Sequence, residues 1–194
     1  MINNETMAWM EAARGGDEDA AARLVHEFHA PLYAFLRRLS GSESDTVELT
    51  QRAFCRAWKS IGTFAGHGTV SSWFHGIAYR TYVDWMRSDR RTEGRTDAWW
   101  DGLPDLAATP DAAAVAADSA AVAWAAVDRL EAGLRETLHL HYYQGLTLEE
   151  TAEVLGIATS TVKYRTREAL AQVQRDLARM EQPRNPNISS LRRA

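Results

Sequence analysis

The chain has 194 residues, of which 45% are hydrophobic and 25% charged, and its formal net charge is −4. This composition indicates a globular, soluble protein with one medium or two small domains. The single cysteine, Cys55, excludes an internal disulfide and fits a reducing cytoplasm. No apolar run approaches the roughly 20 residues of a membrane span, and residues 1–14 lack the pattern of a signal peptide. We therefore expect a cytoplasmic protein.

The negative net charge hides an uneven distribution of charged residues. Residues 96–128 contain no Lys or Arg, whereas basic residues outnumber acidic ones in residues 80–95 and 163–179. Two basic segments are thus separated by an acidic connector. The overall charge therefore does not exclude a nucleic-acid partner.

The sequence of the first half predicts helices. Strand signals are absent, since no sustained alternation of apolar and polar residues is bounded by turn residues. A long amphipathic helix is expected at residues 17–39, and Gly41 stops it. The next helix starts at Ser44 or Asp45, and Cys55 is expected in the core beside its apolar positions. Those positions are Val47, Leu49, Phe54, Ala57, Trp58 and Ile61. Residues 62–71, with three glycines, form a loop, and another helix follows at about residues 72–91.

Residues 92–118 are expected to be a linker, because their prolines, glycines and Ala/Asp-rich tract make a poor core. The Ala-rich part from residue 111 can be helical and merges into a helix that reaches Tyr143. Residues from Met180 onward are expected to be a disordered tail.

Residues 147–170 have the pattern of a helix-turn-helix. Thr147 and Glu150 are spaced as a capping box at the start of its first helix. Gly156 suits the positive φ of a tight turn, and Ser160 or Thr159 is expected to cap the second helix. The second helix has an apolar face and a basic face, as a helix that reads the major groove has. The candidate DNA-binding residues are Ser160, Thr161, Lys163, Tyr164, Arg165 and Arg167. The alternative is a helical hairpin whose basic face is merely solvated.

Taken in order, these segments resemble a bacterial sigma factor of the extracytoplasmic-function (ECF) type, group IV of the sigma-70 family. The similarity covers most of residues 15–180, and the order and spacing of the motifs make it specific. In the first half the matching segments are 32–39 (LYAFLRRL), 48–51 (ELTQ), Phe54, 56–58 (RAW), Phe64, Trp73, 77–78 (IA) and 84–87 (DWMR). In the second half they are 141–147 (HYYQGLT) and the helix-turn-helix.

The resemblance implies an all-α protein with two small helical domains joined by a flexible acidic linker. Residues 1–92 are the expected sigma region 2 domain, 93–120 the linker, 121–180 the sigma region 4 domain and 181–194 the tail. The implied partners are core RNA polymerase, promoter DNA and an anti-sigma factor. The first domain would bind polymerase and read and melt the minus-ten element, and the second would read the minus-thirty-five element.

The resemblance places polymerase binding on the helix that starts near Asp45. A partner helix can use Gln51 for a buried hydrogen bond and Leu49 as an apolar anchor, although an ordinary solvated face has the same spacing. The candidate polymerase-binding residues are Glu48, Leu49, Gln51, Arg52 and Arg56.

When promoter DNA melts, a base leaves the stack and must be bound in a protein pocket. A glycine-rich loop lets the backbone approach such a base. Arg80, Asp84 and Arg87 share one face of the helix after the loop. The candidate minus-ten residues are Phe64, His67, Trp73, Arg80, Asp84 and Arg87. The alternatives are core packing for Trp73 and a solvated face for Arg87. The family often has Asn at the position of Arg80, which leaves the minus-ten base preference open.

Catalytic and metal-binding functions are not indicated. His26 and His29, and His139 and His141, lack Cys or carboxylate partners at ligand spacing, and no phosphate loop or nucleophile elbow appears. We therefore expect no enzyme activity, cofactor or metal. The alternative function is a stand-alone helix-turn-helix regulator, which would bind its site alone as a dimer. An acidic linker that folds back on the basic surfaces as a weak brake remains an alternative to a solvated tether.

Overall fold

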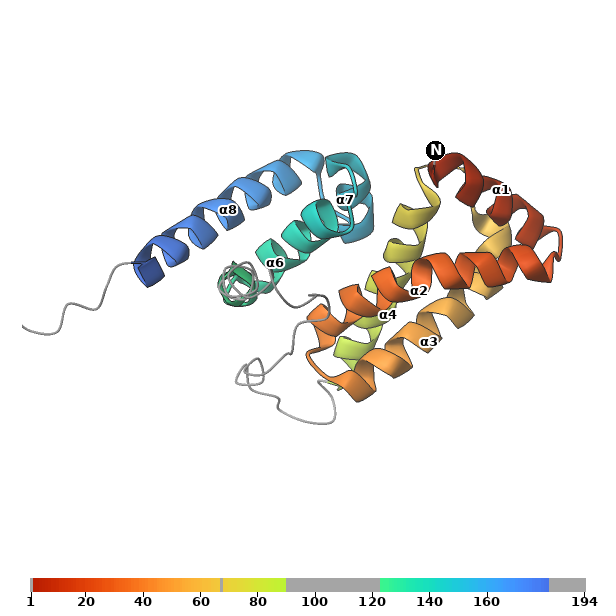
Figure 1. Cartoon of the computed structure of the whole chain (residues 1–194), viewed down its shortest axis with the longest axis horizontal. Helices are drawn as coiled ribbons and strands as arrows, with labels where there is room; N and C mark the ends of the chain where they lie inside the picture. Colours follow the sequence, from red (N-terminus) through yellow and green to blue (C-terminus); the bar gives the residue numbers. More distant parts are fainter. Residues whose placement is uncertain (1, 67, 90–122, 182–194) are drawn as a thin grey trace, which may run out of the picture.

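A computed structural model of the chain describes residues 2–66, 68–89 and 123–181 (Figure 1). Within these ranges every regular element is a helix, as the sequence predicts. The expected linker at 93–120, His67 and residues 182–194 of the expected tail lie outside the described residues. None of the helices in the described part of the chain is both long and apolar enough to cross a membrane.

The N-terminal half is a bundle of four α-helices. Its elements are α1 (Ile2–Arg14), α2 (Glu18–Ser40), α3 (Glu43–Ser60), the short 3₁₀-helix η1 (Ile61–Thr63) and α4 (Val70–Asp89). Helix α1 was not predicted, yet it packs on α2 and buries Met10 completely. Helix α2 begins and ends as predicted, because Asp17 caps it through the Ala20 N–H and Gly41 takes a φ of 71°. Helix α3 begins earlier than predicted, since Ser42 is its N-cap.

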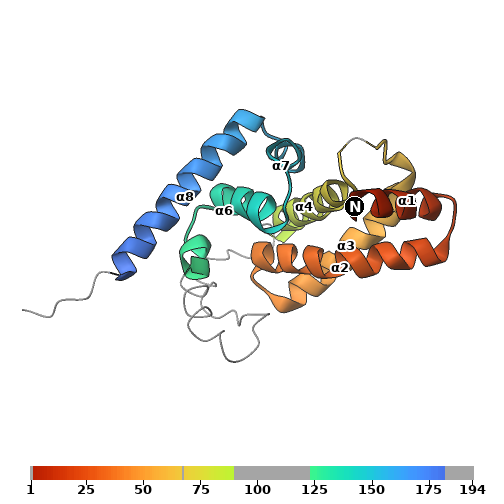
Figure 2. The same ribbon diagram turned by 45° about the horizontal axis from the view of Figure 1, so that its top comes forward.

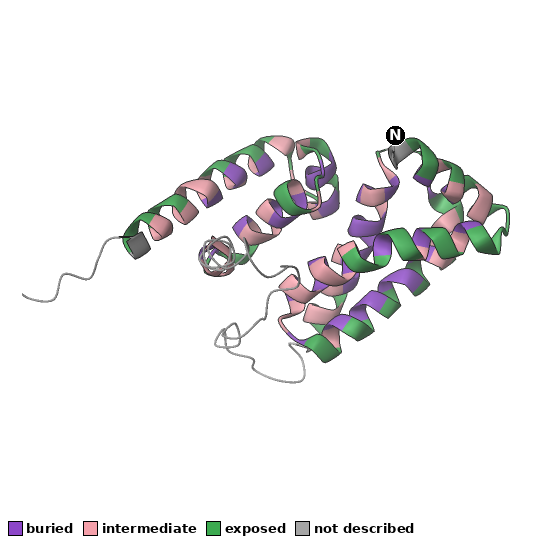
Figure 3. Ribbon diagram, viewed as in Figure 1, coloured by how far each residue is buried: buried purple, intermediate pink, exposed green. Residues whose placement is uncertain are grey.

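Aromatic side chains fill the centre of this bundle. The ring of Phe74 on α4 stacks on Phe28 of α2 at 4.8 Å and contacts Phe54 of α3 at 5.8 Å. Trp58 and Trp73 pack edge-on against the same ring. Figure 3 shows the result as buried stripes along the inner faces of α2, α3 and α4.

The C-terminal half holds the helix-turn-helix. After a helical segment at residues 123–128 come α6 (Ala132–Leu138), the π-helix η2 (His139–Tyr143), α7 (Leu148–Leu155) and α8 (Thr159–Glu181). Thr147 and Glu150 form the predicted capping box, and Gly156 ends α7 with a φ of 66°. The predicted cap of α8 is wrong, because Thr159 is already helical and the Ala158 carbonyl accepts the first helical hydrogen bonds.

The two halves are packed against one another. Helix α4 lies against α7 (Figures 1 and 2), and Leu140, Leu146 and Val154 of the C-terminal half join the core of the N-terminal half. A second, smaller cluster of Leu130, Leu134 and Ala169 holds α6 to α8. The sequence predicts two domains, and the structure adds that they share an apolar interface.

Candidate functional site

The outer face of α3 is a row of exposed polar side chains. Glu48, Gln51, Arg52 and Arg56 are all exposed, as predicted from the helix periodicity. Glu48 and Arg52 pair at i, i+4 with their side chains about half exposed, and such a pair contributes little stability. All four side chains are therefore accessible to solvent.

Three expectations for α3 are wrong. Leu49 is fully buried, as its apolar position predicts, so it is not a surface anchor. Val47, expected among the inward positions, is exposed on the outer face, with 55% of its surface accessible. Cys55 is exposed rather than in the core. The reason is that Thr46 and Thr50 occupy inward positions, where their hydroxyls donate to carbonyls one turn earlier.

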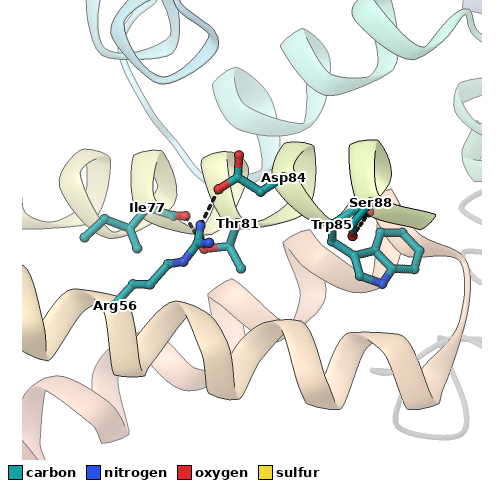
Figure 4. A network of polar contacts seen from close by, with 6 residues as sticks. All are labelled: Arg56, Ile77, Thr81, Asp84, Trp85 and Ser88. Carbon is teal, nitrogen blue, oxygen red and sulfur yellow. Dashed lines mark hydrogen bonds and ion pairs between the residues drawn. The ribbon is translucent and has the colours of Figure 1, made fainter. Parts of the chain in front are cut away.

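An ion pair joins α3 to α4 (Figure 4). Arg56 donates to the Asp84 carboxylate at 2.7 Å and to the Thr81 hydroxyl at 3.3 Å. The sequence assigns Arg56 to polymerase binding and Asp84 to DNA binding, and the structure brings the two side chains together. Each therefore also holds the other in place.

The loop between α3 and α4 is anchored by aromatic packing. Phe64, expected to contact DNA, is buried and lies edge-on against Trp73 at 5.7 Å. This corrects the expectation for Phe64, because its ring fixes the loop and does not face solvent. Trp73 is half-buried between Phe64 and Phe74.

The start of α4 is capped twice. Thr69 and Ser72 form a reciprocal capping box, in which each backbone N–H donates to the other's hydroxyl at 3.1 Å. The Glu150 carboxylate from α7 accepts further hydrogen bonds from the Thr69 N–H at 3.2 Å and from its hydroxyl. Burial alone would raise the pKa of Glu150, but the hydrogen bonds from Thr69 and Thr147 outweigh it and lower that pKa. The glycine-rich loop thus ends against a carboxylate of the C-terminal half.

The exposed side of α4 carries Arg80 and Arg87, both of which face solvent. The Arg80 guanidinium lies over Gly76, where a Cβ would come within 3.4 Å of it. The neighbouring Tyr79 is half-buried and donates a hydrogen bond of 3.0 Å to Glu136. Burial raises the pKa of Glu136, while Tyr79 and nearby Arg135 and Arg165 partly offset that increase.

The front of α8 is open to solvent. Ser160, Lys163, Tyr164 and Arg167 are exposed and Thr161 is half-buried, whereas Val162 and Ala169 are buried on the opposite side. This is the two-faced helix that the sequence predicts.

Arg165 is an exception within the basic set of α8. It is half-buried, and its guanidinium lies against Gly133 of α6. The contact is so close that a Cβ at Gly133 would lie only 3.1 Å from the guanidinium carbon. Its charge also acts on Glu136 and Tyr79. Arg165 therefore faces the other helices more than solvent.

No metal-binding cluster is found in the described ranges, where no three His, Cys, Asp or Glu side chains lie close enough to hold an ion. His26 and His29 lie on the exposed side of α2. His141 instead bonds the Leu146 carbonyl at 2.7 Å.

Each half of the chain matches a known protein family. Residues 24–92 match the Sigma-70 region 2 family and residues 126–175 match the Sigma-70, region 4 family. The ECF RNA polymerase sigma factor BldN of Streptomyces coelicolor is 32% identical over 178 residues, which cover 89% of this chain and 67% of that protein. The ECF RNA polymerase sigma factor SigX of Bacillus subtilis is 30% identical over 152 residues, or 75% and 77% of the two chains.

Two solved structures share the fold. CnrH, in complex with the cytosolic domain of CnrY, superposes with a TM-score of 0.66 at 20% identity, covering 90% of this chain and 98% of that one. The sigma factor RpoE of Bartonella quintana, in complex with the anti-sigma factor NepR, gives 0.63 at 22% identity, with coverages of 81% and 96%. With the family matches and the relatives above, this chain belongs to the ECF RNA polymerase sigma factors of the sigma-70 family, which bind RNA polymerase and direct transcription initiation from specific promoters.

Proposed function

We propose that this sigma factor works through three surfaces: the outer face of α3 for core polymerase, the loop before α4 with α4 itself for the minus-ten element, and the front of α8 for the minus-thirty-five element. The family matches support domain limits of 1–92 and 121–180, with 93–120 as the linker. The observation that carries the proposal is the pair of exposed polar faces, on α3 and on α8, on helices whose other sides are buried.

The polymerase surface consists of Glu48, Gln51, Arg52 and Arg56, with Val47 as the apolar contact in place of Leu49. An exposed apolar residue next to side chains that can form hydrogen bonds is a common binding arrangement. The half-exposed Glu48–Arg52 pair is loosely held, so both partners can exchange it for contacts with polymerase.

The minus-ten surface consists of Arg80 and Arg87 on α4, with Trp73 and the glycine-rich loop. In the packed arrangement this loop meets α7, where a Cβ on Gly68 would lie 3.7 Å from the Glu153 carboxylate. Two carboxylates, Glu150 and Glu153, therefore repel a DNA strand at this point. We infer that the two halves separate before the loop takes up DNA, and that polymerase binding drives the separation.

The minus-thirty-five surface consists of Ser160, Thr161, Lys163, Tyr164 and Arg167. Side chains of these types reach base edges and phosphates from a helix in the major groove. Arg165 reaches DNA only after it leaves Gly133.

We further propose that the chain has no catalytic activity of its own and works in the cytoplasm, where polymerase and promoters are found. Its family consists of regulatory DNA-recognition proteins, which supports the first statement. An anti-sigma factor is the expected regulator, since the similar proteins CnrH and RpoE were solved with CnrY and NepR.

In vitro transcription tests the proposal. The full chain, added to core polymerase on a genomic fragment library, should produce discrete transcripts that neither component makes alone. A stand-alone regulator would instead bind its DNA site without polymerase and as a dimer. Site-specific binding without polymerase, combined with no transcripts, would contradict the proposed function.

A further inference from the structure

Two histidines are buried where the two halves of the molecule meet. His75 on α4 is 1% exposed and His139 in η2 is 3% exposed. Both contact the ring of Phe35 on α2, His75 with its ring centroid at 5.5 Å and His139 at 5.6 Å. One aromatic side chain of the N-terminal half therefore touches a histidine from each half.

His139 sits in a site that disfavours its charged form. Neither ring nitrogen has a hydrogen-bond partner among the described residues. The titratable or charged groups that face it are Arg38 from α2, His75 from α4 and Tyr143 from its own element, at 5.1 Å between rings. Burial, with smaller contributions from repulsion by Arg38 and His75, lowers the pKa of His139 to about 3. A proton on His139 would thus have neither solvent nor a partner.

Arg38 is itself fixed between the two halves. It pairs with Asp128 at 3.2 Å, and its guanidinium carbon lies 3.6 Å from the ring centroid of Trp124. These contacts keep a positive charge near His139 for as long as the halves stay together.

His75 is as deeply buried as His139, but one of its ring nitrogens has a hydrogen-bond partner. Its Nδ1 lies 2.8 Å from the Ser71 carbonyl oxygen. Gln144 and Glu150 face it from the C-terminal half. Burial lowers the pKa of His75, while Ser71, Gln144 and Glu150 partly offset that decrease. His75 therefore acts in the same direction as His139.

We propose that the contact between the two halves of the free protein is released by mild acid, because His139 accepts a proton only after it has left Phe35 and Arg38. The inference concerns the free chain and does not depend on the proposed DNA contacts.

The direction of the pH effect on the contact between the two halves follows from proton linkage. A solvent-exposed histidine titrates near pH 6.5, so below that pH the separated form binds a proton that the packed form excludes. Each pH unit below about 6.5 then raises the ratio of separated to packed molecules about tenfold through His139. Above about pH 7.5 the histidine contributes almost nothing.

Two carboxyl groups at the same interface also titrate. The pKa of buried Glu136 is raised, so its protonation favours the packed form. The pKa of Glu150 is lowered, so it favours separation only in stronger acid. Both groups remain in any His139 variant, and the difference between such a variant and the wild type therefore isolates the histidine.

Amide hydrogen exchange on the full chain tests the inference, because it detects rare opening as well as complete opening. Between pH 7.5 and 5.5, after correction for the intrinsic rate, protection of peptides from the start of α4 and from η2 to α7 should fall about tenfold. Peptides from α3 should keep their protection, because the bundle itself stays folded. Energy transfer between dyes on Cys55 and on Gln174→Cys should decrease over the same range.

The variants decide the origin of the effect. His139→Phe should keep the packed form and respond less to acid than the wild type, because only His75 then remains at the interface. His139→Leu is a second variant if the larger ring does not fit. The matched control is His26→Phe, on the exposed side of α2, which should respond as the wild type does. Unchanged protection in the wild type, a response in both His139 variants as large as that of the wild type, or a loss of protection in α3 equal to that at the interface would each overturn the inference.

Discussion

The Glu150 carboxylate links the first turn of α7 to Thr69, the N-cap of α4, although the two residues are 81 positions apart. One oxygen accepts the Thr147 N–H at 2.9 Å and completes the capping box of α7. The other accepts both polar hydrogens of Thr69. A single side chain therefore caps its own helix and fastens the two halves of the molecule together.

Removing this side chain should weaken both functions. We expect Glu150→Ala to lower the free energy of unfolding by about 1–2 kcal/mol at neutral pH, the size of a lost helix cap. Because hydrogen bonding lowers the pKa of Glu150 in the folded protein, its contribution is present above about pH 4.5 and lost as the pH falls through the folded value. Urea unfolding at pH 7 and pH 4 measures the difference, which should shrink at pH 4. Glu149→Ala, an exposed neighbour in the same turn, should change little at either pH.

Local patterns in the sequence predict the helix-turn-helix well. Thr147, Glu150 and Gly156 act over three or four residues, through a cap and a left-handed turn, and all three behave as expected. The second partner of Glu150 could not be predicted, because no local pattern encodes a contact made 81 residues away.

The errors on α3 have a different cause. The sequence predicts the buried face of α3 from apolar residues alone, which placed both Val47 and Leu49 inward, although Leu49 was also expected to serve as a surface anchor for polymerase. Thr46 and Thr50 are fully or nearly fully buried instead, with their hydroxyls bonded to backbone carbonyls. A threonine that satisfies its own hydroxyl can take an inward position, and a rule based on hydrophobicity does not detect it.

The aromatic cluster around Phe74 should dominate the stability of the N-terminal bundle. Its ring contacts Phe28, Phe54, Trp58 and Trp73 and is 1% exposed. We expect Phe74→Ala to cost about 3–5 kcal/mol, as truncation of a buried aromatic ring typically does. Urea unfolding followed by far-UV circular dichroism measures it. The control Val47→Ala, at an exposed position, should cost less than 0.5 kcal/mol by the usual range for surface changes. Equal costs at the two sites would contradict the packing described here.

Charge reversal on the outer face of α3 should affect polymerase binding and leave the fold intact. Within the described part of the chain Glu48 forms an ion pair only with the half-exposed Arg52, so Glu48→Lys should leave the circular dichroism spectrum native. We expect its affinity for core polymerase to fall about tenfold or more, since one interface charge is reversed. Glu27→Lys, on the exposed side of α2, makes the same charge change elsewhere and should bind as the wild type does. A loss shared by both variants would point to net charge and not to this surface.

The basic residues of α8 should divide into two classes when DNA binding is measured. Lys163 and Arg167 are exposed on the front of the helix, so we expect Lys163→Ala or Arg167→Ala to cost roughly 1–3 kcal/mol on the cognate minus-thirty-five sequence and less on scrambled DNA. Arg165 lies against Gly133, and we expect it to meet a phosphate rather than a base once it has left that position. Arg165→Ala should then weaken cognate and scrambled DNA alike and reduce the salt dependence.

A matched control lies on the same helix. Arg175 is exposed and pairs with Glu168 at 3.3 Å, about two turns beyond Arg167. Arg175→Ala removes the same kind of charge outside the proposed reading surface, and we expect it to change affinity for either DNA by less than twofold at 0.15 M salt, where separated surface charges are screened. Fluorescence anisotropy with the two duplexes at several salt concentrations separates these outcomes. If Lys163→Ala and Arg167→Ala lose cognate and scrambled binding equally, both residues contact phosphates, and the side chains that read the bases must lie among Ser160, Thr161 and Tyr164.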